Sequence, residues 1–216
     1  KFSRHSPALP LYTVDDAKAS LGFFKPLEMG VEFELIKGIK VSFTPVGHIL
    51  GAAAIRVSGQ GKSITFSGDV GRENDLVMNA PQALVDTDYL VVESTYGDRL
   101  HQQLDAFKFF EDIISDTSSR GGVVLIPSFA VGRTQINLHI LQQLRLDKRI
   151  PDLPIYLNSP MAIRATEIFC RYHNEHKLSD LQCRQIDEGT HYVRTPEESI
   201  SLNESHYPSV IVSASG

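Results

Sequence analysis

The chain has 216 residues, 42% hydrophobic and 22% charged, so it is long enough to bury a sizeable core in one large or two modest domains. Its 26 Asp and Glu residues outnumber 21 Lys and Arg residues, and the net charge of −5 excludes binding of nucleic acid through a globally positive field. No apolar run approaches the roughly 20 residues that span a bilayer, and we therefore expect a globular, cytoplasmic protein without a membrane partner.

The first part of the chain predicts one short helix and a set of antiparallel strands. Residues 14–21 have helical spacing and an acidic first turn, and Thr13 precedes them as an N-cap. Three segments rich in β-branched and aromatic residues predict strands within the β-rich region 33–70: 39–46, 52–57 and 63–66. Residues 58–62 predict a hairpin turn between the last two strands, which together indicate half of a sheet layer.

From Asp88 onward, strand and helix patterns alternate. Strands are predicted at 89–93, 122–126, 154–157 and 210–212, and helices around 104–114, at 132–146 and at 160–172. This alternation predicts parallel βαβ units with right-handed crossovers. Residues 177–205 are less informative, except for a helix start at Thr195-Pro196-Glu197-Glu198.

Both ends of the chain indicate a piece of a longer protein. The first residue is Lys1 rather than Met, and the strand at 210–212 runs into the small residues 213–216, where a turn or ligand loop should begin. We expect further residues on both sides.

Two candidate metal ligands follow strands. His48 lies between Gly47 and Gly51, and Asp69 follows Ser67-Gly68 after the next hairpin. An imidazole and a carboxylate are good zinc ligands, and a carboxylate can bridge two metal ions. The alternatives are a glycine-rich turn at His48 and an Asx turn at Asp69.

Other polar residues are weaker candidates. Glu93 ends an apolar strand, where a charge is costly unless used, and it is expected to orient a catalytic or metal-bound histidine or else to cap or pair at the strand end. His173 and His176 are expected to be solvated. Cys170 and Cys183 lack metal-site spacing and are expected to be neither a zinc nor a disulfide pair.

An anion site is predicted where a strand meets the start of a helix. In Pro127-Ser128-Phe129-Ala130-Val131-Gly132-Arg133, the backbone N–H groups of the helix start, Ser128 and Arg133 can contact a phosphate, although a loop cap explains the serine equally well. Asn158-Ser159-Pro160 repeats the pattern, and simple N-capping is favoured there.

Four motifs in this order resemble the β-CASP branch of the metallo-β-lactamase fold. They are Thr44-Pro45-Val46-Gly47-His48-Ile49-Leu50-Gly51-Ala52, Ser67-Gly68-Asp69, Glu93-Ser94-Thr95-Tyr96-Gly97-Asp98 and residues 127–135. The branch includes the nuclease subunit of the cleavage and polyadenylation specificity factor and RNA-processing exonucleases. The resemblance implies an α/β fold with a partial αββα sandwich at 1–96 and an inserted β-CASP domain at 97–216, whose parallel sheet is flanked by helices.

The resemblance also implies a chemistry. His48 matches a terminal zinc ligand, Asp69 the carboxylate that bridges two zinc ions, and Glu93 the first β-CASP motif, so that Asp69 and Glu93 are the expected catalytic residues. Hydrolysis of single-stranded RNA at two zinc ions is implied. The other metal ligands are expected outside the chain, so this piece alone is expected to be inactive.

Substrate contacts and alternatives complete the prediction. Tyr96, Arg99, Ser128 and Arg133 are expected to contact RNA, and a homodimer is one expected assembly. A DNA-directed nuclease of the same branch and an inactive scaffold that binds RNA or a partner protein remain the alternatives; Glu93 favours RNA over DNA mildly, and the presence of His48 and Asp69 argues against the scaffold.

Overall fold

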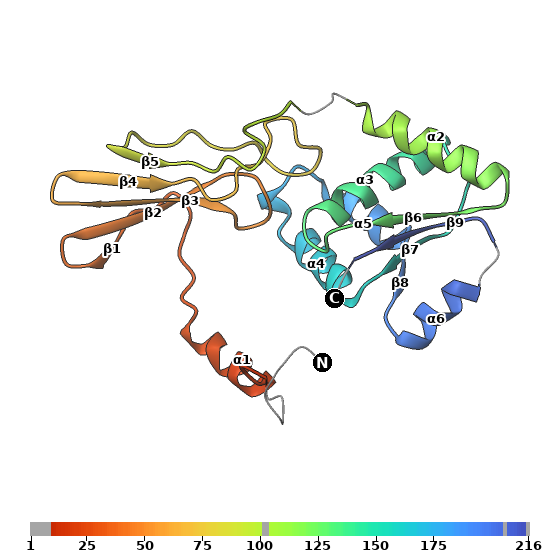
Figure 1. Ribbon diagram of the computed structural model, residues 1–216, viewed down its shortest axis with the longest axis horizontal. Helices are drawn as coiled ribbons and strands as arrows, with labels where there is room; N and C mark the ends of the chain where they lie inside the picture. Colours follow the sequence, from red (N-terminus) through yellow and green to blue (C-terminus); the bar gives the residue numbers. More distant parts are fainter. Residues whose placement is uncertain (1–9, 101–103, 205–206, 215–216) are drawn as a thin grey trace.

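The computed structural model describes residues 10–100, 104–204 and 207–214, which form two lobes side by side (Figure 1). One lobe is a five-stranded sheet in the order β1-β2-β3-β4-β5, and the other is a four-stranded sheet in the order β6-β9-β7-β8 with helices around it. An N-terminal arm with α1 (Val14–Ser20) and the 3₁₀ turn η1 (Leu21–Phe23) extends from the first lobe. The α/β class predicted from the sequence is confirmed.

The five-stranded sheet is an antiparallel meander with one parallel addition. Its strands are β1 (Phe33–Ile36), β2 (Ile39–Pro45), β3 (Ala53–Gly59), β4 (Lys62–Phe66) and β5 (Tyr89–Val91), and β5 pairs parallel to β4. Between β3 and β4 the predicted turn is made by Gln60 and Gly61, with φ of 51° and 73°. Two successive positive φ values give a turn whose twist matches that of the flanking strands.

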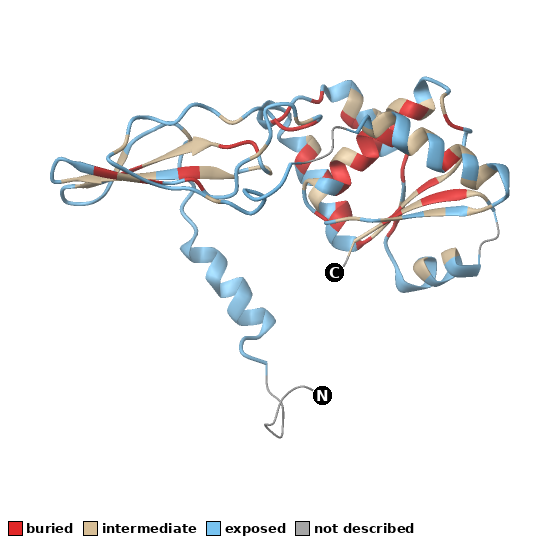
Figure 2. Cartoon of the chain, turned by 45° about the horizontal axis from the view of Figure 1, so that its top comes forward, coloured by how far each residue is buried: buried red, intermediate tan, exposed pale blue. Residues whose placement is uncertain are grey.

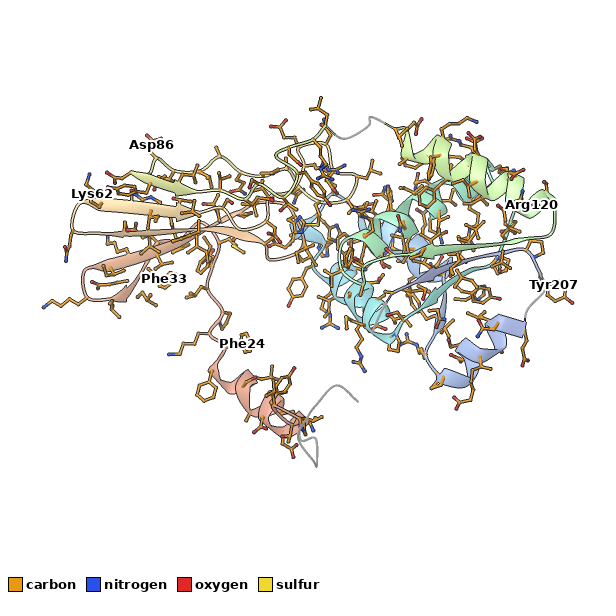
Figure 3. All side chains as sticks on the ribbon, in the orientation of Figure 1. Phe24, Phe33, Lys62, Asp86, Arg120 and Tyr207 are labelled. Carbon is orange, nitrogen blue, oxygen red and sulfur yellow. The ribbon has the colours of Figure 1, made fainter. Side chains whose placement is uncertain are left out.

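This sheet lobe leaves much apolar surface uncovered. Val41, Val46 and Ala54 are buried, whereas Tyr89, Leu90 and Val91 of β5 are 50–59% exposed (Figure 2). On the N-terminal arm, Phe24 projects into solvent (Figure 3). Because a sheet is stable when its apolar face packs against a second layer, the described residues form only part of this lobe's core.

The other lobe has a doubly wound pattern. Its helices are α2 (Ala106–Ser119), α3 (Arg133–Leu146), α4 (Pro160–Arg171), η2 (His173–Glu175), α5 (Asp180–Glu188) and α6 (Pro196–Glu204). Its strands are β6 (Val123–Pro127), β7 (Ile155–Asn158), β8 (His191–Val193) and β9 (Ser209–Ser213), and every pairing among them is parallel, as predicted. Central helix α3 packs against α2, α4 and α5, and its Leu138, Leu141 and Leu144 are fully buried.

Helix starts follow the capping signals in the sequence. Ser159 caps α4, accepting a hydrogen bond from the Ala162 N–H at 3.2 Å, and Pro160 occupies the first turn. At α1 the Thr13 side chain accepts from the Asp16 N–H, and the Asp16 carboxylate accepts from the Thr13 N–H. This reciprocal capping box explains how a seven-residue helix without buried residues has defined ends.

The two lobes are joined through residues 75–78. Val77 and Met78 are buried in the core of the α/β lobe, and the Lys177 N–H donates to the Val77 carbonyl at 2.8 Å. His176, beside this contact, is 5% exposed and stacks on Phe169 with ring centroids 3.9 Å apart. The expectation of a solvated His176 is therefore wrong, because the ring is a packing element of this junction.

Both cysteines lie on helices of the α/β lobe, Cys170 on α4 and Cys183 on α5. Cys170 and Cys183 are free, and Cys183 is buried. Within the described part of the chain, no helix has the length and apolar composition that a bilayer crossing requires.

Candidate metal centre

His48 and Asp69 lie close together at one end of the five-stranded sheet, beyond the last residues of β2 and β4. His48 lies in the turn between β2 and β3, which is closed by a 3.0 Å hydrogen bond from the Ala52 N–H to the Ile49 carbonyl, and Asp69 lies just beyond β4. The His48 Nε2 atom is 3.9 Å from the Asp69 Oδ2 atom, and the side chains are 46% and 75% exposed. The structure thus brings the two predicted metal ligands together with their donor atoms open to solvent.

Two glycines make this approach possible. The Gly71 N–H donates to the Val46 carbonyl at 2.8 Å, which joins the loop after Asp69 to the turn before His48. A Cβ on Gly71 would overlap the Gly47 carbonyl and lie 2.7 Å from the His48 nitrogen. Gly47 has a φ of +64°, where a side chain is strained, and it lies against the Asn79 backbone.

The donor atoms fit zinc as part of a ligand set. Two atoms that each bind a tetrahedral zinc ion at about 2.0–2.2 Å lie roughly 3.4 Å apart, so a small side-chain rotation from the observed 3.9 Å suffices. Imidazole nitrogen and carboxylate oxygen are also the right donor types. Among the described residues, no group of three or more His, Cys, Asp or Glu side chains could hold a metal ion, so the pair accounts for only part of a site.

Glu93 supports the Asp69 loop from a neighbouring segment. It lies two residues beyond β5, and its carboxylate accepts hydrogen bonds from the Val70 N–H at 2.8 Å and the Thr95 hydroxyl at 2.7 Å. The Val70 N–H, followed by the Thr95 hydroxyl, holds the pKa of the Glu93 carboxyl below its ordinary value. Of the histidines in the described segments, none donates to Glu93, so the visible role of this residue is to fix the backbone next to Asp69.

The loop between β6 and α3 is held by polar side chains at the start of α3. The Thr134 hydroxyl donates to the Phe129 carbonyl at 2.8 Å, and the Asn137 amide donates to the Ser128 hydroxyl at 3.2 Å. The Gln135 side chain accepts from the Gly132 N–H at 2.6 Å, and its amide donates to the Ala130 carbonyl and the Thr166 hydroxyl. Thr134, Gln135 and Asn137 are buried, so the loop is fixed by hydrogen bonds to side chains that are themselves held in the protein interior.

This loop reaches the metal-ligand turn. A Cβ on Gly132 would lie 3.0 Å from the Ile49 side chain, so the start of α3 lies against the residue that follows His48. Arg133 is exposed and, within the described ranges, forms no ion pair. Tyr96 and Arg99, two more predicted RNA contacts, are exposed and follow Glu93 closely in the sequence. The guanidinium of Arg99 is already paired with the Asp98 carboxylate at 2.8 Å.

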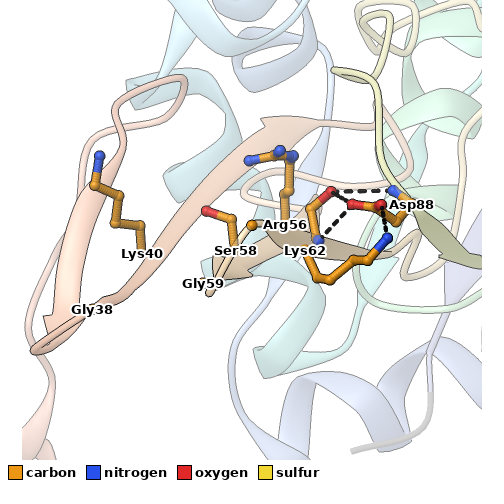
Figure 4. A pocket seen from close by; sticks show the side chains of 9 residues that line it. Gly38, Lys40, Arg56, Ser58, Gly59, Lys62 and Asp88 are labelled. Atoms are coloured by element: carbon orange, nitrogen blue, oxygen red, sulfur yellow. Dashed lines mark hydrogen bonds and ion pairs between the residues drawn. The ribbon is translucent and has the colours of Figure 1, made fainter.

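A cavity at the opposite end of the sheet does not extend the site. It is an open depression of about 380 Å³ lined by nine residues: Gly38, Lys40, Arg56, Ser58, Gly59, Gly61, Lys62, Ser63 and Asp88 (Figure 4). Lys40 is paired with Glu32 at 2.8 Å, and Lys62 is paired with Asp88 at 3.0 Å. The cavity lies where β2 begins, whereas His48 follows the end of β2.

Known proteins resemble this chain over most of its length. Residues 134–216 match the Beta-Casp domain family. "Ribonuclease TTHA0252" of Thermus thermophilus is 34% identical over 96% of the chain, and "RNase J-like protein" of Methanocaldococcus jannaschii is 31% identical over 95%. "Cleavage and polyadenylation specificity factor subunit 3-I" of Arabidopsis thaliana is 35% identical over 80% of the chain and 25% of its own length.

The parallel α/β lobe contains the residues that match the Beta-Casp domain family. Together with these relatives, the match confirms the resemblance to the β-CASP branch that the sequence motifs predicted. The chain spans about half the length of the first two relatives, 49% in each case.

Several supporting residues were missed from the sequence. Gly71 follows Asp69 by two positions, and the polar residues Thr134, Gln135 and Asn137 stand in a helix whose surroundings are apolar. The signal for the second set was present, since polar side chains at buried helix positions need partners. Nothing local distinguished Gly71, because the backbone that it meets comes from a different hairpin.

Proposed function

We propose that the protein of which this chain is a part is a zinc-dependent ribonuclease that cleaves phosphodiester bonds of single-stranded RNA. The observation that carries the proposal is the pair of open ligand atoms of His48 and Asp69, 3.9 Å apart beside the start of α3. The names of relatives with 31–35% identity, a ribonuclease and a cleavage and polyadenylation subunit among them, support RNA as the substrate class.

Each site residue then has a role. His48 and Asp69 would hold zinc, with Asp69 as a ligand shared between two ions. When bound, the metal supplies an ionised water and neutralises charge that develops on the phosphate. Glu93 holds the Asp69 loop through the Val70 N–H. Arg133 orients the RNA backbone from the start of α3, because its exposed guanidinium attracts an anion, whereas the N–H groups of Arg133 and Thr134 already donate to the carbonyls of Val131 and Phe129.

The remaining roles are assigned by position in the fold. Tyr96, Arg99 and Ser128 are exposed or half-buried in the segments nearest this site, and we assign them to RNA contact. We assign residues 1–96 to the metallo-β-lactamase core and 97–216 to the β-CASP domain. The apolar surface of β5 would then pack against the remainder of that core. We further propose that the protein acts in the cytoplasm. The homodimer expected from the sequence stays a prediction.

The test removes one metal ligand from the full-length protein. Asp69→Ala should lower the zinc content measured by mass spectrometry and abolish cleavage of a labelled single-stranded RNA. Asp116→Ala is the control, since this carboxylate is exposed on α2 and, among the described residues, forms an ion pair with Arg120 alone, at 2.7 Å. Unchanged zinc content and cleavage in Asp69→Ala would refute the ligand assignment, and equal cleavage of single-stranded DNA would refute the preference for RNA.

A further inference from the structure

Phe129 combines high exposure with a fixed backbone. Phe129 is 79% exposed, although its carbonyl oxygen accepts two hydrogen bonds from Thr134, which is buried at the start of α3. That oxygen accepts from the Thr134 hydroxyl at 2.8 Å and from the Thr134 N–H at 3.2 Å. An aromatic ring held in water by a locked loop is already organised for contact, because little backbone entropy remains to be lost on binding.

The surroundings of Phe129 select the kind of ligand. The same loop ends at Gly132, whose Cα faces the Ile49 side chain next to His48. Arg133 follows, exposed and without an ion pair in the described segments, at the start of the 14-residue helix α3. A flat apolar ring beside an unpaired cation and a helix start matches a ligand that has a flat aromatic group and a phosphate.

We propose that Phe129 stacks on a nucleobase of the RNA held at the metal centre, while Arg133 contacts the adjacent phosphate. This assignment rests on the proposed ribonuclease function, because it takes RNA as the ligand. Stacking on an aromatic side chain tolerates all four bases, so Phe129 would give affinity and register without sequence preference. Loss of one stacked base weakens binding about 5- to 150-fold.

The experiment measures binding rather than cleavage. In the full-length protein carrying Asp69→Ala to prevent cleavage, the affinity for a fluorescent ten-nucleotide RNA is measured by anisotropy, with Phe129→Leu and Phe129→Trp added in turn. Leucine keeps an apolar side chain and removes the ring, so the affinity should fall about 5- to 150-fold, and tryptophan should restore it. Phe109→Leu, another exposed aromatic position, on α2, should have no effect.

A scan of abasic nucleotides identifies the stacked base. At one position of the RNA, removal of the base should weaken the parent and leave Phe129→Leu unchanged, so that the two affinities become equal. The proposal is overturned if Phe129→Leu binds as well as the parent, or if its loss is the same at every abasic position. It is also overturned if Phe129→Leu lowers the unfolding temperature and Phe129→Trp fails to restore binding, since the ring would then pack against protein. If the parent itself binds no RNA, the proposed function fails as well.

Discussion

Replacing Gly71 by alanine should separate the two metal ligands. The new Cβ would overlap the Gly47 carbonyl and lie 2.7 Å from the His48 nitrogen, where ordinary contacts begin at 3.4 Å. The backbone around His48 must therefore move by about 0.7 Å at the nitrogen and further at the carbonyl. Both clashing atoms belong to backbone that hydrogen bonds already hold, so we expect a loss of about 2–3 kcal/mol in unfolding free energy, the upper part of the range for overpacking.

The functional effect should be about as large, in free-energy terms, as the loss of stability. A displacement approaching 1 Å in a catalytic group costs on the order of 100-fold in rate. Zinc affinity, measured by competition with a chelating dye on the full-length protein, should fall together with RNA cleavage. Gly22→Ala is the matched control, because a Cβ there meets nothing within 4 Å. A Gly71→Ala protein with parental zinc affinity and cleavage would refute the argument that this glycine sets the distance between His48 and Asp69.

Two further substitutions test the packing around the site and the sheet. Gln135→Ala removes three hydrogen bonds and leaves buried partners unsatisfied, so urea denaturation should show a loss of about 2–4 kcal/mol; a loss below about 0.5 kcal/mol would contradict a role for this residue in fixing the loop. Asp88 has a pKa lowered to about 2, chiefly by the Lys62 hydrogen bond and then by Ser63. Since its pKa in the folded state lies below the unfolded value of about 3.9, the charged form stabilises the protein above that pH and this contribution is lost as the pH falls toward 2. Asp88→Asn should therefore be less stable than the parent at pH 7 and approach the parental stability near pH 2, and a difference that stays constant with pH would contradict this assignment.

Local signals in the sequence were sufficient for most elements. The caps at Thr13 and Ser159 and the turn at Gln60-Gly61 act over a few residues, and the structure has all three. Elements with few apolar residues were harder to predict. The short helix α5 buries only Cys183 and Ile186, and strand β8 has three residues, so their positions are set by packing on α3 and β7 rather than by their own pattern.

His176 shows the same limit at one residue. Its charged neighbours in the sequence predicted solvent exposure, yet the ring donates through Nε2 to the Phe169 carbonyl and accepts the Leu178 N–H at Nδ1. Both ring nitrogens have hydrogen-bond partners inside the protein, so burying the ring leaves no polar atom unpaired. The partners come from α4 and from the following turn, and no periodicity in the sequence relates those segments.

The candidate site depends on close backbone contacts between segments distant in the sequence. Gly71 meets the turn of His48, Gly47 meets the backbone of Asn79, and Gly132 brings α3 against Ile49. The first two contacts set where the metal ligands stand, and the third sets where the start of α3 stands relative to them. Motif order could predict that these segments belong to one site, but only the folded chain shows that glycine is required at the points where they touch. A larger side chain at any of them would push apart the ligand pair or the anion-binding helix start, so these glycines serve the site through geometry rather than through chemistry of their own.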